Sequence, residues 1–287
     1  MPLPTPAEPP SPPAGEPESE RRASERLFSE RHFHDEWARS IDPEAVVPAQ
    51  NFEPDTAIEN QYVLARLGDL HDKRLLDIGC GAGEAAVYFA QRGAAVTAMD
   101  LSGAFLRVVR HVADRHHAVI TLVVGAGEHL PFPDNSFDVV YGHGVLHHLE
   151  LHDAMREVSR ILRPGGRAFF IEPLGYNPVI DVYRWMAGNL RTPSERPLRF
   201  SDVDAIRPLF TRVDHREFWL TTQLVFVWFL VGMGVHPARE RYWKKVLYDA
   251  DRIRWLFGPL YRLEKWLLSR WPWVGRFSWN SVIVLEK

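Results

Sequence analysis

Ten residues, LLDIGCGAGE at positions 75–84, give the first indication of how this chain folds. The apolar start is typical of a short buried strand, and Asp77 lies close to its end. Gly79, Gly81 and Gly83 follow at every second position, ahead of a helical pattern. Glycines at a strand-to-helix turn let the backbone approach a ligand closely. A tight turn without a ligand is the alternative, because the spacing differs from the G-x-G-x-x-G of dinucleotide-binding folds.

Strand-like and helix-like segments alternate around this turn. The strand-like runs are RLLDIG (74–79), AVTAMD (95–100), ITLVVG (120–125), FDVVYGHG (137–144), RAFFIEP (167–173), RVDHREFWL (212–220) and NSVIVLEK (280–287). Helical patterns lie at 24–39 and 58–67, and between most of the strands. Alternation of this kind predicts an α/β fold with a mostly parallel sheet and helices on both faces.

Composition narrows the class of protein. The 287 residues carry a net charge of −3, so neither a nucleic-acid-binding surface nor an acidic tail is indicated. The single cysteine, Cys80, excludes an intramolecular disulfide framework and suits a reducing compartment. Residues 1–22 are rich in proline and lack the apolar stretch of a secretory signal, so we expect a disordered tail there.

The last two strands are separated by roughly 60 residues, and we expect them to pair with a helical insertion between them. Eight of the ten tryptophans lie between Trp219 and Trp279. The insertion includes a run of 21 residues, 218–238, without Asp, Glu, Lys or Arg. Further along, leucines recur at helical spacing, and Gly258-Pro259 predicts a break in that helix.

The motifs resemble those of the class I S-adenosylmethionine-dependent methyltransferases, a family with many small-molecule enzymes. LLDIGCGAGE is similar to the first motif of the family, AVTAMDLS to its second, GAGEHLPFPDNSFDVVYGHGVLHHL to its third and fourth, and ILRPGG to the turn before its fifth strand. The resemblance covers residues 51–218. It implies a Rossmann-like seven-stranded sheet with S-adenosylmethionine as cofactor. We therefore divide the chain into a tail (1–22), an N-terminal helical lid (23–70), a cofactor-binding core (71–220), a tryptophan-rich insertion (221–278) and a final core strand (279–287).

The resemblance also implies a set of cofactor-binding residues. Asp77 and the backbone of Gly79, Gly81 and Gly83 would hold the methionyl end, while Asp100 and Leu101 would hold the ribose and flank the adenine. The segment Ala126, Gly127 and Glu128 would run past the adenine edge, with His143 near the methyl group. Many family members have Asp-Ala-Glu at 126–128, so one side-chain acceptor for the adenine is missing here. A surface aspartate is the plainer interpretation of Asp100.

Four histidines, His143, His147, His148 and His152, follow the fourth strand. A histidine is poised to take a proton near neutral pH, and His143 and His148 are our candidate catalytic residues. Packing or capping of the next helix is the alternative. Some quinone methyltransferases resemble this region with a Glu-x-x-Glu-His metal motif, but Gly144 and His147 replace its glutamates. We therefore predict no metal.

Three further residues are candidates for contact with the acceptor. Glu172, at the end of the fifth strand, could orient a hydroxyl or amine, and a structural hydrogen bond is its alternative role. Phe33 and Trp37 would belong to the N-terminal lid over the pocket, or to a helix packed on the sheet.

The insertion raises the question of membrane contact. Its densest apolar part, 224–235, is only 12 residues long, and a crossing would separate the last strand from its sheet, so we expect no span. Residues 251–277 carry six Arg or Lys and two acids among Trp and Leu, a composition that suits a membrane interface. An amphipathic helix packed on the sheet is the alternative.

These observations lead to an expected function and its rivals. We expect methyl transfer to a lipophilic small molecule, such as a quinone, phenol, polyketide or lipid, with residues 221–235 lining its pocket or dipping into one leaflet. We expect a cytoplasmic protein. Peripheral contact with the inner face of the membrane, through residues 221–277, is a further expectation. Methylation of a soluble metabolite, with the insertion as a dimer contact, is one rival. A non-catalytic docking adaptor is the other, and the oligomeric state stays open.

Overall fold

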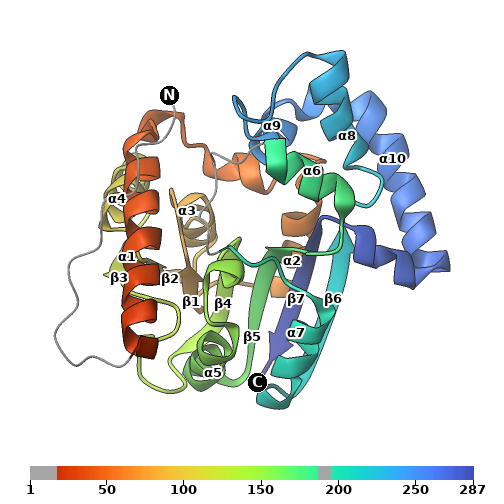
Figure 1. The fold of residues 1–287 in the computed structure, drawn as a ribbon. Helices are drawn as coiled ribbons and strands as arrows, with labels where there is room; N and C mark the ends of the chain where they lie inside the picture. The colour runs from red at the N-terminus through yellow and green to blue at the C-terminus, as the bar shows by residue number, and fades with distance from the viewer. Residues whose placement is uncertain (1–17, 187–194) are drawn as a thin grey trace.

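A seven-stranded sheet forms the centre of the molecule (Figure 1), for which the computed structural model describes residues 18–186 and 195–287. The strands are β1 (Arg74–Ile78), β2 (Ala95–Asp100), β3 (Ile120–Val124), β4 (Phe137–His143), β5 (Leu162–Pro173), β6 (Arg212–Phe218) and β7 (Asn280–Glu286). Their order is β3-β2-β1-β4-β5-β7-β6, and the first five pair in parallel. The predicted Rossmann-like, mostly parallel sheet is confirmed.

The last two strands pair as expected. β7 runs antiparallel to both of its neighbours, with Arg212 of β6 opposite Glu286 and Arg167 of β5 opposite the same residue. The final strand thus lies between β5 and β6. The 61 residues from 219 to 279 leave the sheet at the end of β6 and return to it at the start of β7.

Helices cover both faces of the sheet because consecutive strand residues point to opposite sides. Leu75 packs with Phe89 of α3, whereas Leu76 packs with Met155 of α5. The helical elements between the strands are α3 (Glu84–Ala90), α4 (Gly103–Arg115), η3 (Leu146–His148), α5 (Leu151–Ile161), α6 (Pro178–Met186), α7 (Phe200–Ile206) and η5 (Arg207–Leu209).

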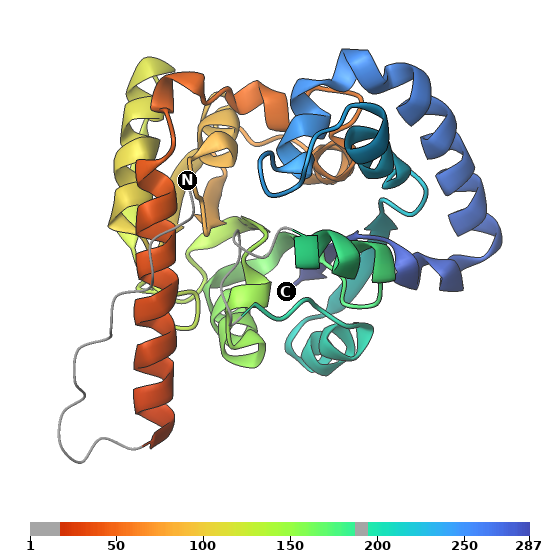
Figure 2. The ribbon, with the colours of Figure 1, turned by 45° about the horizontal axis from the view of Figure 1, so that its top comes forward.

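The N-terminal segment starts earlier than predicted. Helix α1 spans Glu18–Arg39, so residues 18–22 are helical rather than part of a disordered tail, while residues 1–17 lie outside the described chain. The run of charged residues at 18–22 sustains the helix through an i, i+4 ion pair between Arg22 and Glu18. Two short turns, η1 (Pro43–Ala45) and η2 (Pro48–Asn51), then lead to α2 (Ile58–Leu67). Helix α1 lies beside α4, and most of the insertion lies on the other side of the molecule (Figure 2).

The insertion is helical, as predicted. It contains α8 (Leu224–Val227), a π-helical turn η6 (Trp228–Gly232), α9 (Tyr242–Tyr248), α10 (Ala250–Arg270) and η7 (Pro272–Phe277). The predicted break at Gly258-Pro259 is wrong, because α10 continues through Pro259. Gly258 is half-exposed and Pro259 is exposed, so the helix can include the proline although its nitrogen has no N–H to donate.

One buried carboxylate fixes the insertion to the core. Glu264 of α10 accepts hydrogen bonds from the backbone N–H groups of Trp219, Leu220, Thr221 and Thr222, at 2.9–3.1 Å. The Thr222 hydroxyl donates to it as well, at 2.7 Å. These are the backbone donors that precede α8, so Glu264 satisfies groups that would otherwise be unpaired in the interior.

The apolar stretch 221–235 is divided between core and surface. Val225, Phe226 and Phe229 are buried, whereas Leu224 and Val231 are exposed. Within the described residues, no helix is both long enough and apolar enough to span a bilayer. The stretch therefore holds the insertion against the sheet through one of its faces and leaves the other face open.

Candidate functional site

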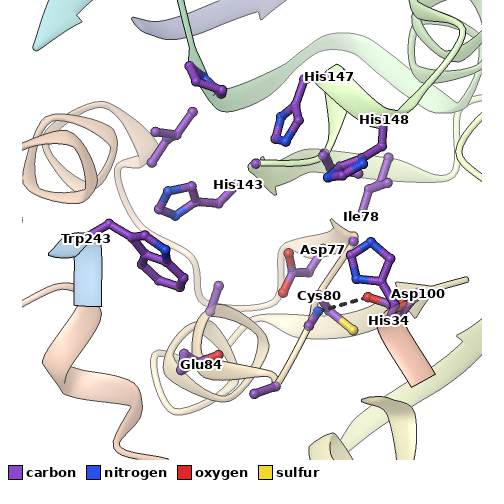
Figure 3. Close-up of a pocket in the computed structure, with 18 of the residues that line it drawn as sticks. His34, Asp77, Ile78, Cys80, Glu84, Asp100, His143, His147, His148 and Trp243 are labelled. Carbon is purple, nitrogen blue, oxygen red and sulfur yellow. Dashed lines mark hydrogen bonds between the residues drawn. The ribbon is translucent and has the colours of Figure 1, made fainter. Parts of the chain in front are cut away.

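A cavity of about 380 Å³ lies at the carboxyl ends of β1, β2 and β4 (Figure 3). Three parts of the chain line it: the N-terminal helices, the strand ends, and the insertion. The lining includes Glu30, Phe33, His34, Trp37, Glu59, Asp77, Gly79, Gly81, Asp100, Leu101, Ala126, Gly127, Glu128, His143, His148, Tyr183, Trp219, Arg241, Trp243, Lys244 and Trp279. Ligand sites at this edge are usual for open parallel sheets, because loops and helix starts converge there.

The glycine turn forms one wall. Gly79, Gly81 and Gly83 all have positive φ, at 66°, 52° and 86°, a region that favours glycine. A Cβ at Gly81 would meet nothing within 4 Å, whereas one at Gly83 would lie 2.9 Å from Val109. Gly81 therefore faces the cavity, and Gly83 instead allows α3 to pack against α4. Sequence reasoning had grouped the three glycines together.

Asp77 lies in an environment that favours binding of a cation. Its side chain is buried, and its Oδ2 has no hydrogen-bond donor among the described residues. Burial, and then the nearby charges of Asp100 and Glu84, hold the pKa of Asp77 well above its usual range. A backbone hydrogen bond from Ala86 opposes this shift, but one carboxylate oxygen stays buried without a donor among the described residues. Since such an oxygen is costly to bury, the site fits a ligand that carries an ammonium group.

Asp100 both lines the cavity and shapes it. Its Oδ2 accepts a hydrogen bond from the Gly81 N–H at 3.0 Å, and its Oδ1 accepts one from the Ser102 N–H at 2.8 Å. Burial raises the pKa of Asp100, and the two backbone donors and His34 oppose that shift. The aspartate thus joins the end of β2 to the glycine turn, and each oxygen keeps a lone pair for a ligand hydroxyl.

The segment 126–128 lines the cavity. A Cβ at Gly127 would lie 2.5 Å from Leu149, so the missing side chain lets the two loops touch. Glu128 lines the cavity but also pairs with Arg26 of α1 at 2.5 Å and accepts from the Glu150 N–H at 3.1 Å. Its carboxylate therefore ties the N-terminal helix to the start of α5.

His143 ends β4 and exposes its ring to the cavity (Figure 3). The ring is open to the cavity, and desolvation by the surrounding protein lowers the pKa of His143, while the carboxylates of Glu172 and Glu84 partly oppose the shift. A lowered pKa favours the neutral imidazole, the state in which the ring can accept a proton. This geometry suits the base that the sequence suggested.

Glu172 is fully buried and does not line the cavity. Its Oε1 accepts from the Val145 and Leu146 N–H groups at 2.8 and 2.7 Å, and its Oε2 lies 2.7 Å from Nδ1 of His147. Burial alone would raise the pKa of Glu172, but these partners lower it. Glu172 therefore has a structural role, because both of its carboxylate oxygens bind groups of the loop after β4.

His148 meets the N-terminal helix. Its Nδ1 lies 3.1 Å from Oε2 of Glu30, and the same oxygen lies 3.5 Å from Nε2 of His34. These three donor atoms lie within 4.8 Å of one another, as do those of His147, His148 and Glu195. Each group could hold a metal by its donor types, and the absence of a metal stays a prediction.

Both predicted lid residues line the cavity, and other contacts fix their helix. Phe33 and Trp37 face it from α1. On the same helix, Asp35 accepts from the Ser102 hydroxyl and the Ala104 N–H, at 2.5 and 3.3 Å. The ring of Trp37 stacks on the guanidinium of Arg241, with Cζ 3.6 Å from the ring centroid. Helix α1 thereby touches both the cofactor-side loops and the insertion.

Several lining residues were missed by sequence reasoning. Glu59 and Asn60 start α2, and Arg241, Trp243 and Lys244 come from the start of α9. Glu59 accepts from Trp219 Nε1 at 2.5 Å and from Asn280 Nδ2 at 2.9 Å, and burial raises its pKa to about 7. Only the tertiary fold brings these segments together. Residues 221–235, in contrast, contribute nothing to the described lining, so their expected role as pocket wall is wrong.

Known proteins match the centre of the chain. A family described as Methyltransferase domain matches residues 76–170. The "Probable phthiotriol/phenolphthiotriol dimycocerosates methyltransferase 2" of Mycobacterium ulcerans is 34% identical over 157 residues, which cover 53% of this chain and 58% of that protein. A fatty-acid O-methyltransferase of Mycolicibacterium smegmatis is 31% identical over 172 residues (55% and 61%). A demethylmenaquinone methyltransferase of Chlorobaculum tepidum is 38% identical over 105 residues (36% and 42%). The chain thus spans about half the length of the curated relatives it matches.

Solved structures match the fold over more of the chain. Phosphoethanolamine N-methyltransferase 2 of Haemonchus contortus, solved with S-adenosylhomocysteine, superposes with a TM-score of 0.59 at 18% identity, over 89% of this chain and 59% of that one. The cyclase SpnF has a TM-score of 0.51 at 20% identity, over 82% and 85%. A cyclase on this fold illustrates that fold alone does not fix chemistry.

The assignment rests on motif, sheet and match together. The family match covers β1 to β5, the part of the sheet that supplies the glycine turn, Asp77, Asp100 and His143. The motifs in this part of the chain resemble those of the class I S-adenosylmethionine-dependent methyltransferases. Residues 76–170 belong to the family described as Methyltransferase domain.

Proposed function

We propose that this protein transfers a methyl group from S-adenosylmethionine to a lipophilic small molecule. The observation that carries the proposal is one continuous cavity whose lining joins the glycine turn and Asp77 to aromatic side chains of the insertion. A site of this kind can hold a polar cofactor and an apolar acceptor side by side.

The polar half has the groups to hold the cofactor. Asp77 would bind its ammonium, Gly79 and Gly81 would allow close approach of the backbone, and Asp100 with Leu101 would bind and flank the nucleoside together with residues 126–128. The bound cofactor supplies a methyl group that is already activated as part of a sulfonium. Since a sulfonium is cationic, the carboxylates of Asp77, Glu84 and Asp100 give the cavity a favourable charge.

The protein then has two tasks, which are alignment and proton removal. Methyl transfer needs the acceptor held in line and water excluded, which the lid and the aromatic walls can provide. Where the acceptor must lose a proton, His143 would receive it, because its lowered pKa favours the unprotonated ring. His148, whose Nδ1 lies 3.1 Å from Oε2 of Glu30, is the second candidate.

The apolar half favours a lipophilic acceptor. Tyr183, Trp219, Trp243 and Trp279 line it, and aromatic walls bind apolar ligands through large contact areas. The relatives named for dimycocerosates, fatty acids and demethylmenaquinone support the same substrate class for this chain. A soluble metabolite would leave these aromatic walls without a matching partner.

We also propose peripheral membrane contact, and we narrow it to the second half of α10 and η7. Leu263, Trp266, Trp271, Trp273 and Phe277 are exposed there. The cations interleaved with them are Arg262, Lys265, Arg270 and Arg276, and none has an acidic partner within 4 Å among the described residues. Exposed tryptophans among uncompensated cations are the composition that anionic bilayers attract.

Vesicle flotation tests the membrane contact. We expect the protein to float with vesicles containing 30% phosphatidylglycerol and to remain at the bottom with pure phosphatidylcholine, since charge attraction is needed. Replacing Arg262, Lys265 and Arg270 with Gln should abolish flotation without changing thermal stability. Equal behaviour of the two vesicle types, or dimerisation through this surface on a sizing column, would refute the proposal.

A radiolabel assay tests the main function. The protein would be incubated with S-adenosylmethionine labelled on its methyl group and with quinols, phenols, fatty acids and soluble amines, and each mixture would be extracted with organic solvent. We expect label in the organic phase for one lipophilic class. Label only in aqueous products would favour the soluble-metabolite alternative, and no cofactor binding at all in calorimetry would favour the adaptor.

A further inference from the structure

Arg241 is a cation placed in the cavity by the insertion. It directly precedes α9, is half-buried, and lines the cavity together with Trp243 and Lys244. Its guanidinium lies over the ring of Trp37 of α1, with Cζ 3.6 Å from the ring centroid. The stacking fixes the position of the charge without neutralising it.

Within the part of the chain that the structure describes, no acid lies within ion-pair distance of the Arg241 guanidinium. Among residues 18–186 and 195–287, neither a salt bridge nor a hydrogen bond of the Arg241 guanidinium is present, whereas Lys244, three residues later, lies 3.5 Å from Glu84. Burial lowers the pKa of Arg241 to about 10, with partial opposition from Tyr183 and Glu195. A desolvated cation is costly unless an anion accompanies it, so the site gains most from a ligand that brings one.

The geometry of the guanidinium limits what that ligand can be. The contact with the Trp37 ring uses none of the five N–H donors of the guanidinium in a hydrogen bond, and these donors lie in a fixed fork. The edge of a guanidinium matches the two oxygens of a carboxylate or phosphate. The neighbouring walls are aromatic, from Tyr183, Trp219 and Trp279.

We propose that Arg241 is the anchor for an oxyanion, so that the acceptor is an amphiphile with a carboxylate or phosphate head and an apolar body. This inference rests on the proposed function, since it describes the acceptor half of the same cavity. It requires the acceptor to carry a negative charge, which a lipophilic acceptor in general need not have. It also makes Trp37, through its stacking on Arg241, a positioning residue for the anchor.

Three ten-carbon probes test the charge requirement by calorimetry on the full chain: decanoate, decyl phosphate and decanol, all below their aggregation concentrations. We expect decanoate or decyl phosphate to bind wild type about 10- to 100-fold more tightly than decanol, the range that a charge-assisted hydrogen bond supplies. Arg241→Gln should lose that advantage and leave decanol binding unchanged. A stronger effect for decanoate identifies a carboxylate head, and a stronger effect for decyl phosphate identifies a phosphate.

Matched variants separate the anchor from a general effect. Arg241→Lys keeps the charge but loses the fork, so it should retain only part of the advantage, and Arg252→Gln, at an exposed position in α10, should behave as wild type. Each variant is also titrated with S-adenosylhomocysteine and melted by circular dichroism. Equal affinity of wild type for decanoate, decyl phosphate and decanol would overturn the inference while cofactor binding persists. Absence of S-adenosylhomocysteine binding in wild type would instead overturn the proposed function.

Discussion

The two halves of the cavity are built in different ways. The polar half, called the cofactor half because we propose that the cofactor binds there, consists of strand ends and the turn at 79–83. Backbone conformation and two buried aspartates define its shape. The apolar half, called the acceptor half for the same reason, consists of side chains from α1, α2 and the insertion. Contacts such as Glu59 with Trp219 and Trp37 with Arg241 join these segments. The first half depends on a short local motif, and the second on segments up to 221 residues apart. Such a division would suit a family whose members share one cofactor but differ in their acceptors.

If the halves are independent, damage to the insertion should spare the cofactor half. Glu264→Ala removes the acceptor of four backbone N–H groups and the Thr222 hydroxyl. We expect a loss of about 3–5 kcal/mol in the free energy of unfolding, because those groups stay buried without a partner. Urea denaturation measures the loss. S-adenosylhomocysteine affinity of the folded variant should remain within a few-fold of wild type, and a joint collapse of both would contradict the comparison.

The reverse experiment changes the cofactor half alone. Asp77→Asn removes a carboxylate whose pKa is raised mainly by burial. We expect S-adenosylhomocysteine affinity to fall about 100-fold, or about 2.7 kcal/mol. The free energy of unfolding should rise slightly, since the cost of the buried charge disappears. Calorimetry and urea denaturation measure the two effects. A variant that is less stable and binds normally would show that Asp77 is structural.

The pH dependence of stability tests the contact between the halves, where Glu59 accepts hydrogen bonds from Trp219 and Asn280. Burial raises the pKa of Glu59 from 4.5 to about 7 in the folded protein. The folded state therefore binds more protons than the unfolded chain between those values, and stability falls as pH rises through the window. We expect the Glu59 contribution to decrease by about 2 kcal/mol between pH 5.5 and 7. Urea curves for wild type and Glu59→Gln at both pH values isolate it, and identical pH profiles would refute the assignment.

The same division explains what sequence could and could not predict. The residues of the cofactor half follow one another within short motifs, so Asp77, Gly81, Asp100 and His143 could be placed at the cavity in advance. Gly83 and Glu172 look the same in sequence whether they face a ligand or the interior. Their roles, as a packing glycine and a loop acceptor, depend on Val109 and His147 across the fold.

The acceptor half was predicted only in outline. The tryptophan-rich composition indicated the insertion, and the topology excluded a span. Hydrophobicity nonetheless pointed to residues 221–235 as the pocket wall, although they form a core contact and an outer surface. The wall comes from the more polar start of α9, with Arg241 and Lys244. A polar residue that faces a cavity has no periodic signature, so sequence pattern cannot identify it.

A crystal structure of the full chain with S-adenosylhomocysteine and decanoate tests the central claim most directly, because it locates both halves at once. The account predicts the ammonium of S-adenosylhomocysteine at Asp77, its ribose at Asp100, and the decanoate head at Arg241 with its chain against Trp219 and Trp279. S-adenosylhomocysteine bound away from the turn at 79–83, or bound there with the acceptor half filled by its own nucleoside, would contradict it.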